Sequence, residues 1–505
     1  MSAELFKIVV VGFYVLLTLW LSWVGMRKTR DIKGFSIGNK DMSPWVIGIT
    51  MAASVSSTAT FVINPGFVYV HGMSAFVHYA VAGSAGIMCA FLLLTRRFRQ
   101  LGDDSGAITI PDWIYQRYQS RSLSTFFALI NLLSVAFVVL ILVGCSLLLS
   151  QLFPISQTWS LTLILLFVFS YVLMGGSYAH AYTNTFQGVM MIGVALFIFV
   201  QGFHYFQGDV LGSLRSVGEN YVSIFNPDSS LYYSFFSVFF SGFVVTFALM
   251  MQPHILTKML YLKNDGDVKR FLWSTFLSGT CFMLMLSVGF YARLKGMDVP
   301  QQDGVVVSYI TSEFSNVSWG PYALVFISIT LLAAGMSTLD GILVSVSAMV
   351  VKDLYQPFSG KGQFEHGRGL LLSRVVLVAV GLLAYVVALN PPALVGLFAQ
   401  KGVYGLAAAS MVPIVLGTLL RQPPPVVVAW ASAAVGLVVH LLCTFALGVA
   451  NPAVSATYAI VLSALTAAIL MLVISFKNKN PSIDSELYST SVENPVDNSS
   501  GVEFK

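Results

Sequence analysis

The chain has 505 residues, of which 56% are apolar and only 10% carry a charged side chain. Soluble domains carry about a quarter charged residues, so this composition excludes a water-soluble globular protein. Apolar runs longer than the roughly 20 residues that cross a bilayer recur along the chain, and they predict an all-α integral membrane protein. A β-barrel is excluded because its strands would give alternating segments of about ten residues.

The apolar runs predict thirteen membrane spans, numbered here 0 to 12 in chain order. They cover 5–26, 43–70, 74–95, 122–150, 156–176, 181–205, 230–252, 271–293, 319–349, 370–389, 393–419, 425–447 and 455–476. The short links after spans 1, 3 and 4 predict antiparallel neighbours, whereas 206–229 and 294–318 are longer polar loops. No apolar run follows residue 479, so a membrane domain of 1–479 is expected to end in a disordered cytoplasmic tail, 480–505.

Basic residues predict the orientation of the spans. With the N-terminus outside, the inner segments hold 22 of the 27 Lys and Arg residues, Lys258 among them, and the outer segments hold four. The remaining one, Lys401, falls within span 10. Because cytoplasmic loops are enriched in Lys and Arg, this distribution predicts an outer N-terminus and a cytoplasmic C-terminus in a plasma membrane, the inner membrane of a bacterium. The net charge of +5 follows from this topology, so no nucleic-acid partner is expected.

Span 1 contains the sequence ITMAASVSSTATFVINPGFVYVHG over 49–72, which is unusually polar for a membrane helix. Five hydroxyl residues fall within seven positions, namely Ser54, Ser56, Ser57, Thr58 and Thr60. Asn64, Pro65 and Gly66 follow, and they weaken or break a helix. One or two hydroxyls serve helix packing, but this number predicts a discontinuous helix whose exposed carbonyls bind an ion and a substrate.

Span 6 is expected to hold a matching break, because transporters with broken helices are often built from inverted repeats. Ser241-Gly242 lie in its middle, Thr246 lies below them, and Gln252-Pro253-His254 close its inner end. The sequence therefore predicts a repeat of five plus five helices, with spans 1–5 at about 43–205 and spans 6–10 at about 230–419. Span 0 and spans 11 and 12 would be additions to this repeat.

Span 8 supplies a second polar cluster in LLAAGMSTLDGILVSVSAMVVKDLY. Ala334, Ser337, Thr338 and Gly341 share one helical face at three- to four-residue spacing. Sodium is a hard cation satisfied by carbonyl and hydroxyl oxygens, so this face beside unwound carbonyls suffices for a sodium site. Asp340 lies within the span, where a carboxylate either makes a structural hydrogen bond or faces a cavity, an ion or a partner.

These features resemble the sodium:solute symporter family, whose members share the LeuT-type fold. The resemblance covers spans 0 to 10 and is carried by GFSIGNKDMSPWVIGITMAAS, TIPDWIYQRYQS, GGSYAHAYTNTFQG, QPHILTKML and MSTLDGILVSVSAMVVKDLY in this order. Within the family the chain is most similar to the pantothenate-symporter branch. The resemblance implies a LeuT-type repeat of five plus five helices with one extra N-terminal and two extra C-terminal helices.

The resemblance also implies one sodium site between spans 1 and 8. Its ligands would be the backbone carbonyls of Ala53, Ser56 and Ala334 and the hydroxyls of Ser337 and Thr338. Some relatives carry an acidic residue on span 5, in a T-D-x-x-Q pattern, at a second sodium site. The pattern here is TNTFQ, with Asn184 in place of the acid. One sodium ion is therefore expected, unless Asp340 restores the missing charge from span 8.

A substrate pocket lined by spans 1, 2, 3, 6 and 10 is implied in the same way. Its candidate residues are Ser54, Ser57, Thr58, Thr60, His78, Tyr79, Thr246, Gln400, Lys401 and Tyr404. His78 is either a packing residue or a ligand. Lys401 either extends to the outer surface or acts as a counter-charge or gate for an anionic substrate.

The function predicted is sodium-coupled import, by alternating access, of a small organic solute, an organic anion such as a monocarboxylate or pantothenate. A sodium-coupled amino-acid or sugar symporter is the alternative within this class. A membrane sensor built on a transporter fold is the alternative from another class, although the short tail leaves no room for a kinase domain. No H-E-x-x-H motif or nucleophile–base constellation is present, so no enzyme is expected. Sodium, the solute and lipid are the expected partners, and the oligomeric state stays open.

Overall fold

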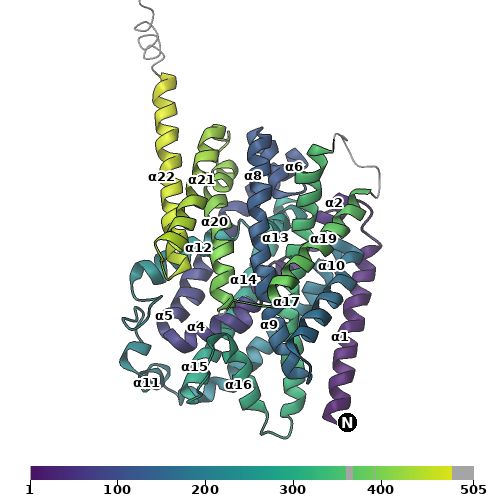
Figure 1. Cartoon of the computed structure of the whole chain (residues 1–505), viewed down its shortest axis with the longest axis vertical. Helices are drawn as coiled ribbons and strands as arrows, with labels where there is room; N and C mark the ends of the chain where they lie inside the picture. The colour runs from purple at the N-terminus through teal and green to yellow at the C-terminus, as the bar shows by residue number, and fades with distance from the viewer. Residues whose placement is uncertain (1, 360–367, 393, 480–505) are drawn as a thin grey trace, which may run out of the picture.

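The computed structural model describes residues 2–359, 368–392 and 394–479, and within these ranges the chain is helical without strands. The predicted tail, 480–505, lies outside the described residues. The long helices in Figure 1 are α1 (Ala3–Met26), α6 (Ser84–Ser105), α9 (Val135–Leu152), α10 (Gln157–Gly202), α14 (Asp265–Met283), α17 (Gly320–Met349), α19 (Arg368–Ala388), α20 (Val395–Leu419), α21 (Val426–Leu441) and α22 (Pro452–Lys479). The shorter ones are α2 (Ile32–Ser36), α3 (Pro44–Val55), α4 (Asn64–His71), α5 (Met73–Phe76), α7 (Ile110–Tyr118), α8 (Arg121–Asn131), α11 (Val210–Arg215), α12 (Ser241–Leu249), α13 (Pro253–Leu256), α15 (Ser287–Leu294), α16 (Val305–Phe314) and α18 (Gln356–Phe358).

Ten helical segments within the described ranges are long and apolar enough to cross a membrane, and two bent helix pairs bring the total to twelve. The thirteenth predicted span is found inside α10, which covers most of both 156–176 and 181–205. Gly176 interrupts this helix with φ 51° and ψ −130°, a conformation that a residue with a side chain rarely adopts.

The chain folds back on itself at Gly176. The rings of Phe167 and Phe186 each lie 6.2 Å from the ring of Tyr14 on α1. In a straight helix these two residues would stand about 28 Å apart along the axis. The two halves of α10 therefore run in opposite directions, so the thirteen predicted spans are all present.

The break in span 1 lies between α3 and the π-helix η1 (Ala59–Ile63), where the two parts of the span meet at 54°. Ser56 ends α3 with φ −94° and ψ 73°, outside the helical region. The prediction that Asn64-Pro65-Gly66 interrupts the span is wrong, because these residues begin α4 directly after η1. Proline is tolerated in a first helical turn, where its missing N–H leaves no helical bond unmade.

The break in span 6 follows α12 and precedes α13, at a bend of 66°. The predicted break at Ser241-Gly242 is wrong, since both residues begin a regular helix after the π-helix η6 (Phe236–Phe240). A Cβ on Gly242 would lie 3.0 Å from atoms of His78 and Ala82, so this glycine permits close helix packing. The break comes at Gln252, which is extended (φ −62°, ψ 141°), as expected of a residue before proline.

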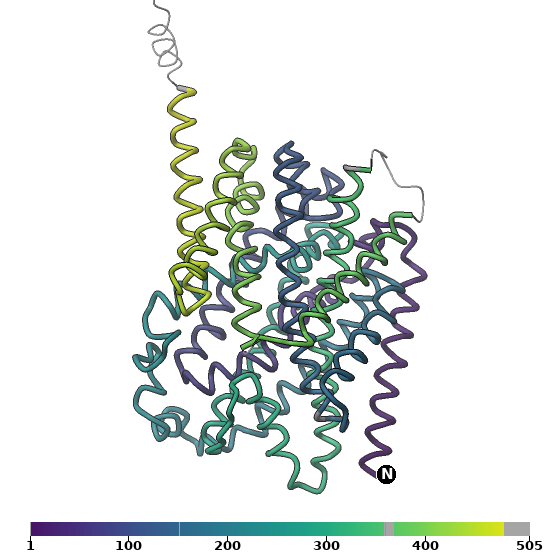
Figure 2. Tube along the Cα trace, in the orientation of Figure 1, coloured from purple at the N-terminus to yellow at the C-terminus, as the bar shows by residue number. Residues whose placement is uncertain are grey.

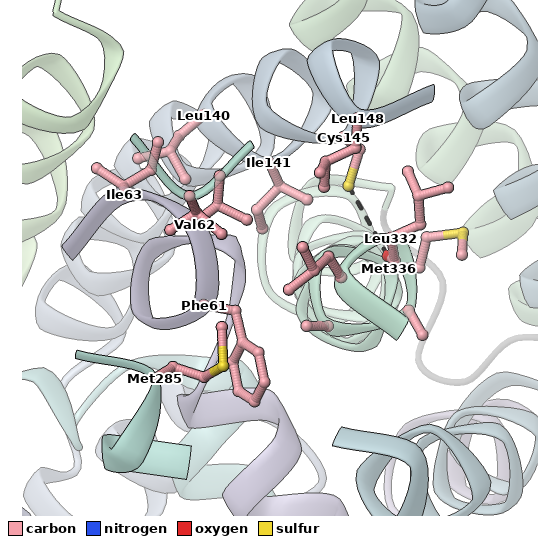
Figure 3. Packing of buried hydrophobic residues seen from close by; sticks show 14 of the residues in the cluster. Phe61, Val62, Ile63, Leu140, Ile141, Cys145, Leu148, Met285, Leu332 and Met336 are labelled. Atoms are coloured by element: carbon pink, nitrogen blue, oxygen red, sulfur yellow. Dashed lines mark hydrogen bonds between the residues drawn. The ribbon is translucent and has the colours of Figure 1, made fainter. Parts of the chain in front are cut away.

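The part of span 1 that follows the break is packed between α9 and α17. Figure 3 shows Val62 and Ile63 of η1 beside Leu140 and Ile141 of α9, all of them fully or almost fully buried. The Cys145 thiol of α9 reaches the Leu332 carbonyl of α17 at 3.8 Å. This packing holds the break in span 1 against the middle of α17.

The two ends of the described chain lie on opposite sides of the helix assembly. In Figures 1 and 2 α1 begins at the lower end, while α22 ends beyond the other helices at the upper end. An odd number of spans requires this arrangement. Large apolar side chains of α1, α19 and α22 are exposed, as a surface that faces lipid requires.

Candidate functional site

The polar clusters of spans 1 and 8 meet where α3 ends. The Ser337 hydroxyl on α17 lies 3.0 Å from the Ala53 carbonyl oxygen and 2.8 Å from the Ala334 carbonyl oxygen. The Thr338 hydroxyl donates to the Ser54 carbonyl at 3.0 Å. Three of the five predicted sodium ligands thus converge on one point, and a fourth lies against the next carbonyl of α3.

The fifth predicted ligand, Ser56, stands at the break itself. Its N–H donates to the Ala52 carbonyl at 2.9 Å, which is the last helical bond of α3. Because the backbone leaves the helical conformation at Ser56, its own carbonyl is released from the regular pattern. Hydroxyl and carbonyl oxygens therefore gather here in the type of environment that a hard monovalent cation requires.

Asn184 on α10 joins this junction from a third side. Its amide nitrogen donates to the Ser337 carbonyl at 2.6 Å and to the Ser54 hydroxyl at 3.2 Å. The amide oxygen is buried and has no hydrogen-bond partner. Asn184 therefore links α10 to both α3 and α17, and a neutral amide stands directly beside the predicted sodium ligands.

Asp340 lies one helical turn further along α17 and is completely buried. One carboxylate oxygen is 2.8 Å from Nδ1 of His180, and the other accepts a hydrogen bond from the Tyr171 hydroxyl at 3.3 Å. Of the two predicted roles for Asp340, the observed contacts are those of a hydrogen-bonded group. Asp340 and Asn184 hydrogen-bond to different groups, and the second sodium site suggested for them stays a prediction.

A cavity extends from the break in span 1 to the break in span 6. Its walls come from η1, the π-helix η2 (Val77–Gly83), α9, α12, α13 and α20. Seven of the ten predicted substrate residues line it, namely Ser54, Ser57, Thr60, Tyr79, Thr246, Gln400 and Tyr404. Ser54 also contacts Thr338 and Asn184, so the cavity and the predicted sodium site adjoin each other.

The other three predicted residues are absent from the described lining. Thr58 turns its hydroxyl toward the Cys145 thiol of α9, at 3.9 Å. Nδ1 of His78 lies 3.1 and 3.0 Å from two carbonyl oxygens of η6, which is the packing role. The Lys401 carbonyl lies 2.8 Å from Nε2 of His440 on α21, and the Lys401 side chain is only partly buried.

Three polar lining residues were not predicted, namely Asn64, Gln252 and His254. The side-chain oxygen of Gln252 and Nδ1 of His254 are buried without a hydrogen-bond partner. Such groups are costly to leave unsatisfied unless a ligand or water meets them. The sequence signal for Gln252 and His254 is that they flank Pro253 at the end of span 6. A proline at that point predicts the break in the span more directly than Ser241-Gly242 does.

One wall of the cavity contains a group of aromatic side chains. The Tyr79 hydroxyl lies 2.9 Å from the Tyr232 hydroxyl and also contacts the Gln400 side chain. The ring of Tyr232 is 4.7 Å from that of His78. The ring of His78 also lies 4.9 Å from the ring of Tyr79, so His78 supports this lining residue through aromatic contacts.

The segment before α3 is held by an ion pair and a hydrogen bond. Lys28 contacts Asp41 at 3.0 Å, and the Tyr178 hydroxyl donates to the same carboxylate. Burial raises the pKa of Asp41, but these two hydrogen bonds outweigh burial and bring its pKa below the ordinary value. Asp41 therefore remains charged and fixes the segment before α3 against α10.

Residues 35–422 match the model of the sodium:solute symporter family. The chain belongs to this family. The sodium/pantothenate symporter of Haemophilus influenzae is 26% identical to this chain over 401 residues, which cover 78% of this chain and 81% of that protein. The osmoregulated proline transporter of Bacillus subtilis is 24% identical over 408 residues, covering 77% and 79%.

Solved structures agree with the predicted LeuT-type fold. A Na⁺-coupled sialic acid symporter in a substrate-bound outward-open state matches with a TM-score of 0.73 at 16% identity, over 92% of this chain and 98% of that one. The nucleobase-cation-symport-1 transporter Mhp1 in a closed conformation gives 0.55 at 13% identity, over 88% and 95%. The predicted family and fold are confirmed, and the protein is an integral membrane symporter that couples a small solute to sodium.

Proposed function

We propose that the symporter imports a small monocarboxylate with hydroxyl or amide groups, of the pantothenate class, together with one sodium ion. The observation that carries this proposal is the charge of the cavity. Its described lining holds hydroxyls and amides but no Lys, Arg, Asp or Glu. The predicted sodium ligands are likewise neutral oxygens.

Charge balance then favours an anionic solute. A net charge is costly in a membrane interior, and a sodium ion with one carboxylate is neutral as a pair. A sugar or a zwitterionic amino acid would leave the sodium charge without a partner. Pantothenate-like solutes also carry hydroxyl and amide groups, which hydrogen bonds from Gln400, Gln252 and the hydroxyl residues would satisfy. Lys401 has no part in this proposal, since it is not among the described lining residues.

The two broken spans supply the mechanism. The residues of α3 and α17 hold sodium at the end of α3, and Ser54 connects that ion to the cavity. Bending at the breaks in spans 1 and 6 opens the cavity to one side of the membrane at a time. The inward sodium gradient drives the cycle, with the N-terminus outside and the C-terminus in the cytoplasm of a bacterium.

Uptake into proteoliposomes tests the proposal with a labelled panel of pantothenate, lactate, proline and glucose. Pantothenate or lactate uptake should require an inward sodium gradient, and pantothenyl alcohol, which lacks the carboxylate, should fail to compete. Because one sodium ion and one carboxylate carry no net charge, an inside-negative potential should not accelerate uptake. Sodium-driven proline or glucose uptake that the potential accelerates would replace the anion proposal with the amino-acid or sugar alternative.

Two substituted cysteines test the orientation. In a background without the four native cysteines, Ser2→Cys should react with an impermeant maleimide in intact cells, and Asn478→Cys should react only after permeabilisation. The reverse pattern would place the N-terminus in the cytoplasm.

A further inference from the structure

An apolar groove lies between α6 and α14, outside the solute cavity. Its exposed part is lined by two residues of α6 and four of α14, namely Met88, Leu92, Lys269, Leu272, Trp273 and Phe276. Three of these residues also line a deeper part, which includes Val55 and Ser56 at the break in span 1. This space, called the α6–α14 groove below, therefore leads from the surface of the protein to the break.

The groove exists because α3 and α14 pack tightly at one level and leave open space at the next. A Cβ on Gly48 of α3 would lie 2.5 Å from the Cβ of Ser274, and the Thr275 hydroxyl donates to the Gly48 carbonyl at 3.2 Å. Five residues beyond Ser274, a Cβ on Gly279 would meet no atom within 4 Å. Gly279 lines the deeper part of the groove, so the open space beside it belongs to the groove.

The surroundings of the groove indicate what fills it. Leu92 and Trp273 are each 60% exposed, on helices that are long and apolar enough to cross a membrane. Large exposed apolar side chains at this depth face lipid rather than water. Water does not occupy apolar spaces, and an empty groove forfeits dispersion contacts along its walls. An acyl chain of the adjacent leaflet is therefore the occupant that the bilayer itself supplies.

Lys269 provides a charge for the headgroup. It lies four residues after the start of α14 and one turn before Trp273, at the end of a span where lipid phosphates and tryptophans gather. Its side chain is exposed, and among the residues that the structure describes it forms no ion pair. Asp265 and Asp267, in the first turn of the same helix, are already paired with arginines. The ammonium is therefore available to an anionic headgroup, which basic residues at a membrane surface attract.

We propose that the α6–α14 groove binds one anionic phospholipid, such as phosphatidylglycerol, with its phosphate at Lys269 and one acyl chain extending to the break in span 1. The chain then contacts Val55 and Ser56, where the span bends. Val55, Ile87 and Met283 line both this groove and the solute cavity, so the bound chain lies against a wall of the cavity. The phospholipid is thus a ligand that packs against the break from the membrane side.

Native mass spectrometry of the purified, delipidated full-length symporter tests the site, with lipids added in detergent. The wild type should bind one long-chain phosphatidylglycerol. It should bind zwitterionic phosphatidylcholine about fivefold more weakly, and Lys269→Gln should lose this preference, because one basic residue near an anionic headgroup has about that effect. Dihexanoyl phosphatidylglycerol, which has the headgroup without a chain of sufficient length, should also bind weakly. Gly279→Leu should weaken long-chain binding about fivefold or more, because its side chain competes with the acyl chain for the same space.

Two matched variants control for effects of the substitutions themselves. Lys263→Gln removes an exposed lysine that does not line the groove, and Gly193→Leu adds a side chain at an exposed glycine of α10 where a Cβ also meets no atom within 4 Å. Both should bind phosphatidylglycerol as the wild type does. Bound phosphatidylglycerol should also raise the unfolding temperature of the wild type and of both controls more than that of Lys269→Gln.

Each other outcome overturns the proposal. Equal binding of the two long-chain lipids by the wild type, or an unchanged preference in Lys269→Gln, would mean that the lysine selects no headgroup. Wild-type binding in Gly279→Leu would place the chain outside the groove. A lipid-free dimer that Gly279→Leu dissociates would make the groove an interface between two copies of the chain. If Gly279→Leu cannot be purified, Lys269→Gln and the short-chain lipid carry the test.

Discussion

Ser337→Ala is the most direct test of the predicted sodium site. The hydroxyl now bridges the Ala53 carbonyl of α3 and the Ala334 carbonyl of α17, at 3.0 and 2.8 Å. In the loaded site the same oxygen would face the ion between these two carbonyls. A polar contact to a charged group contributes about 1.5 to 3 kcal/mol, and each 1.4 kcal/mol is about tenfold in affinity. We therefore expect the sodium concentration for half-maximal uptake to rise between about tenfold and about 150-fold.

The assay is initial uptake of the solute identified in the panel, measured against sodium concentration at saturating solute. Ser347→Ala is the matched control, because Ser347 is buried on the same helix and its hydroxyl donates to the Val344 carbonyl of its own turn at 2.9 Å. The control should keep the wild-type sodium dependence. If Ser337→Ala, or the double variant with Thr338→Ala, shows the same sodium dependence as the control, the site has been assigned wrongly.

Three further predictions concern charge, solute and packing. Asn184→Asp places a carboxylate beside the sodium ligands, so uptake should become sensitive to an inside-negative potential; no such sensitivity would mean that no second cation is recruited. Lys401→Gln should change the KM of the carboxylate by less than about twofold, as expected of a residue away from the cavity lining, and a larger rise would put this lysine in the solute path. Gly289→Ala puts a Cβ 2.2 Å from the Pro65 carbonyl and should cost about 1–3 kcal/mol in thermal unfolding. Gly279→Ala meets no atom within 4 Å and should stabilise by up to about 1 kcal/mol; equal unfolding temperatures would contradict the packing argument.

The sequence predicted the spans well because each requires a long apolar run, a signal that needs no tertiary information. The exact breaks were harder to place. Gly242 was taken as a helix breaker, but glycine in a membrane helix often serves close packing, and here it faces His78 and Ala82. Pro253 acts through its own covalent structure on the residue before it, so it marks the break in span 6 reliably.

The candidate site shows the same division. The predicted sodium ligands on α3 and α17 were found from a recognisable break and a polar helix face, and the structure brings most of them together. Thr58 and His78 lie on predicted spans too, but which way each side chain points depends on neighbouring helices that one sequence does not place. Lys258 was placed in a segment between two spans, and only the folded chain shows that its side chain is buried and donates to the His254 carbonyl.

The fold-back at Gly176 has a consequence for how the protein is inserted into the bilayer. No polar loop separates the two halves of α10, so one half cannot stay in water while the other half crosses the membrane. They must enter lipid together as a helical hairpin during synthesis. A side chain at this position would oppose φ 51° and would also meet Phe35, with a Cβ 2.4 Å from its ring. A chain that failed to turn there would cross the membrane once where it should cross twice. Every later helix, including the one that carries Ser337, would then have an inverted orientation in the membrane.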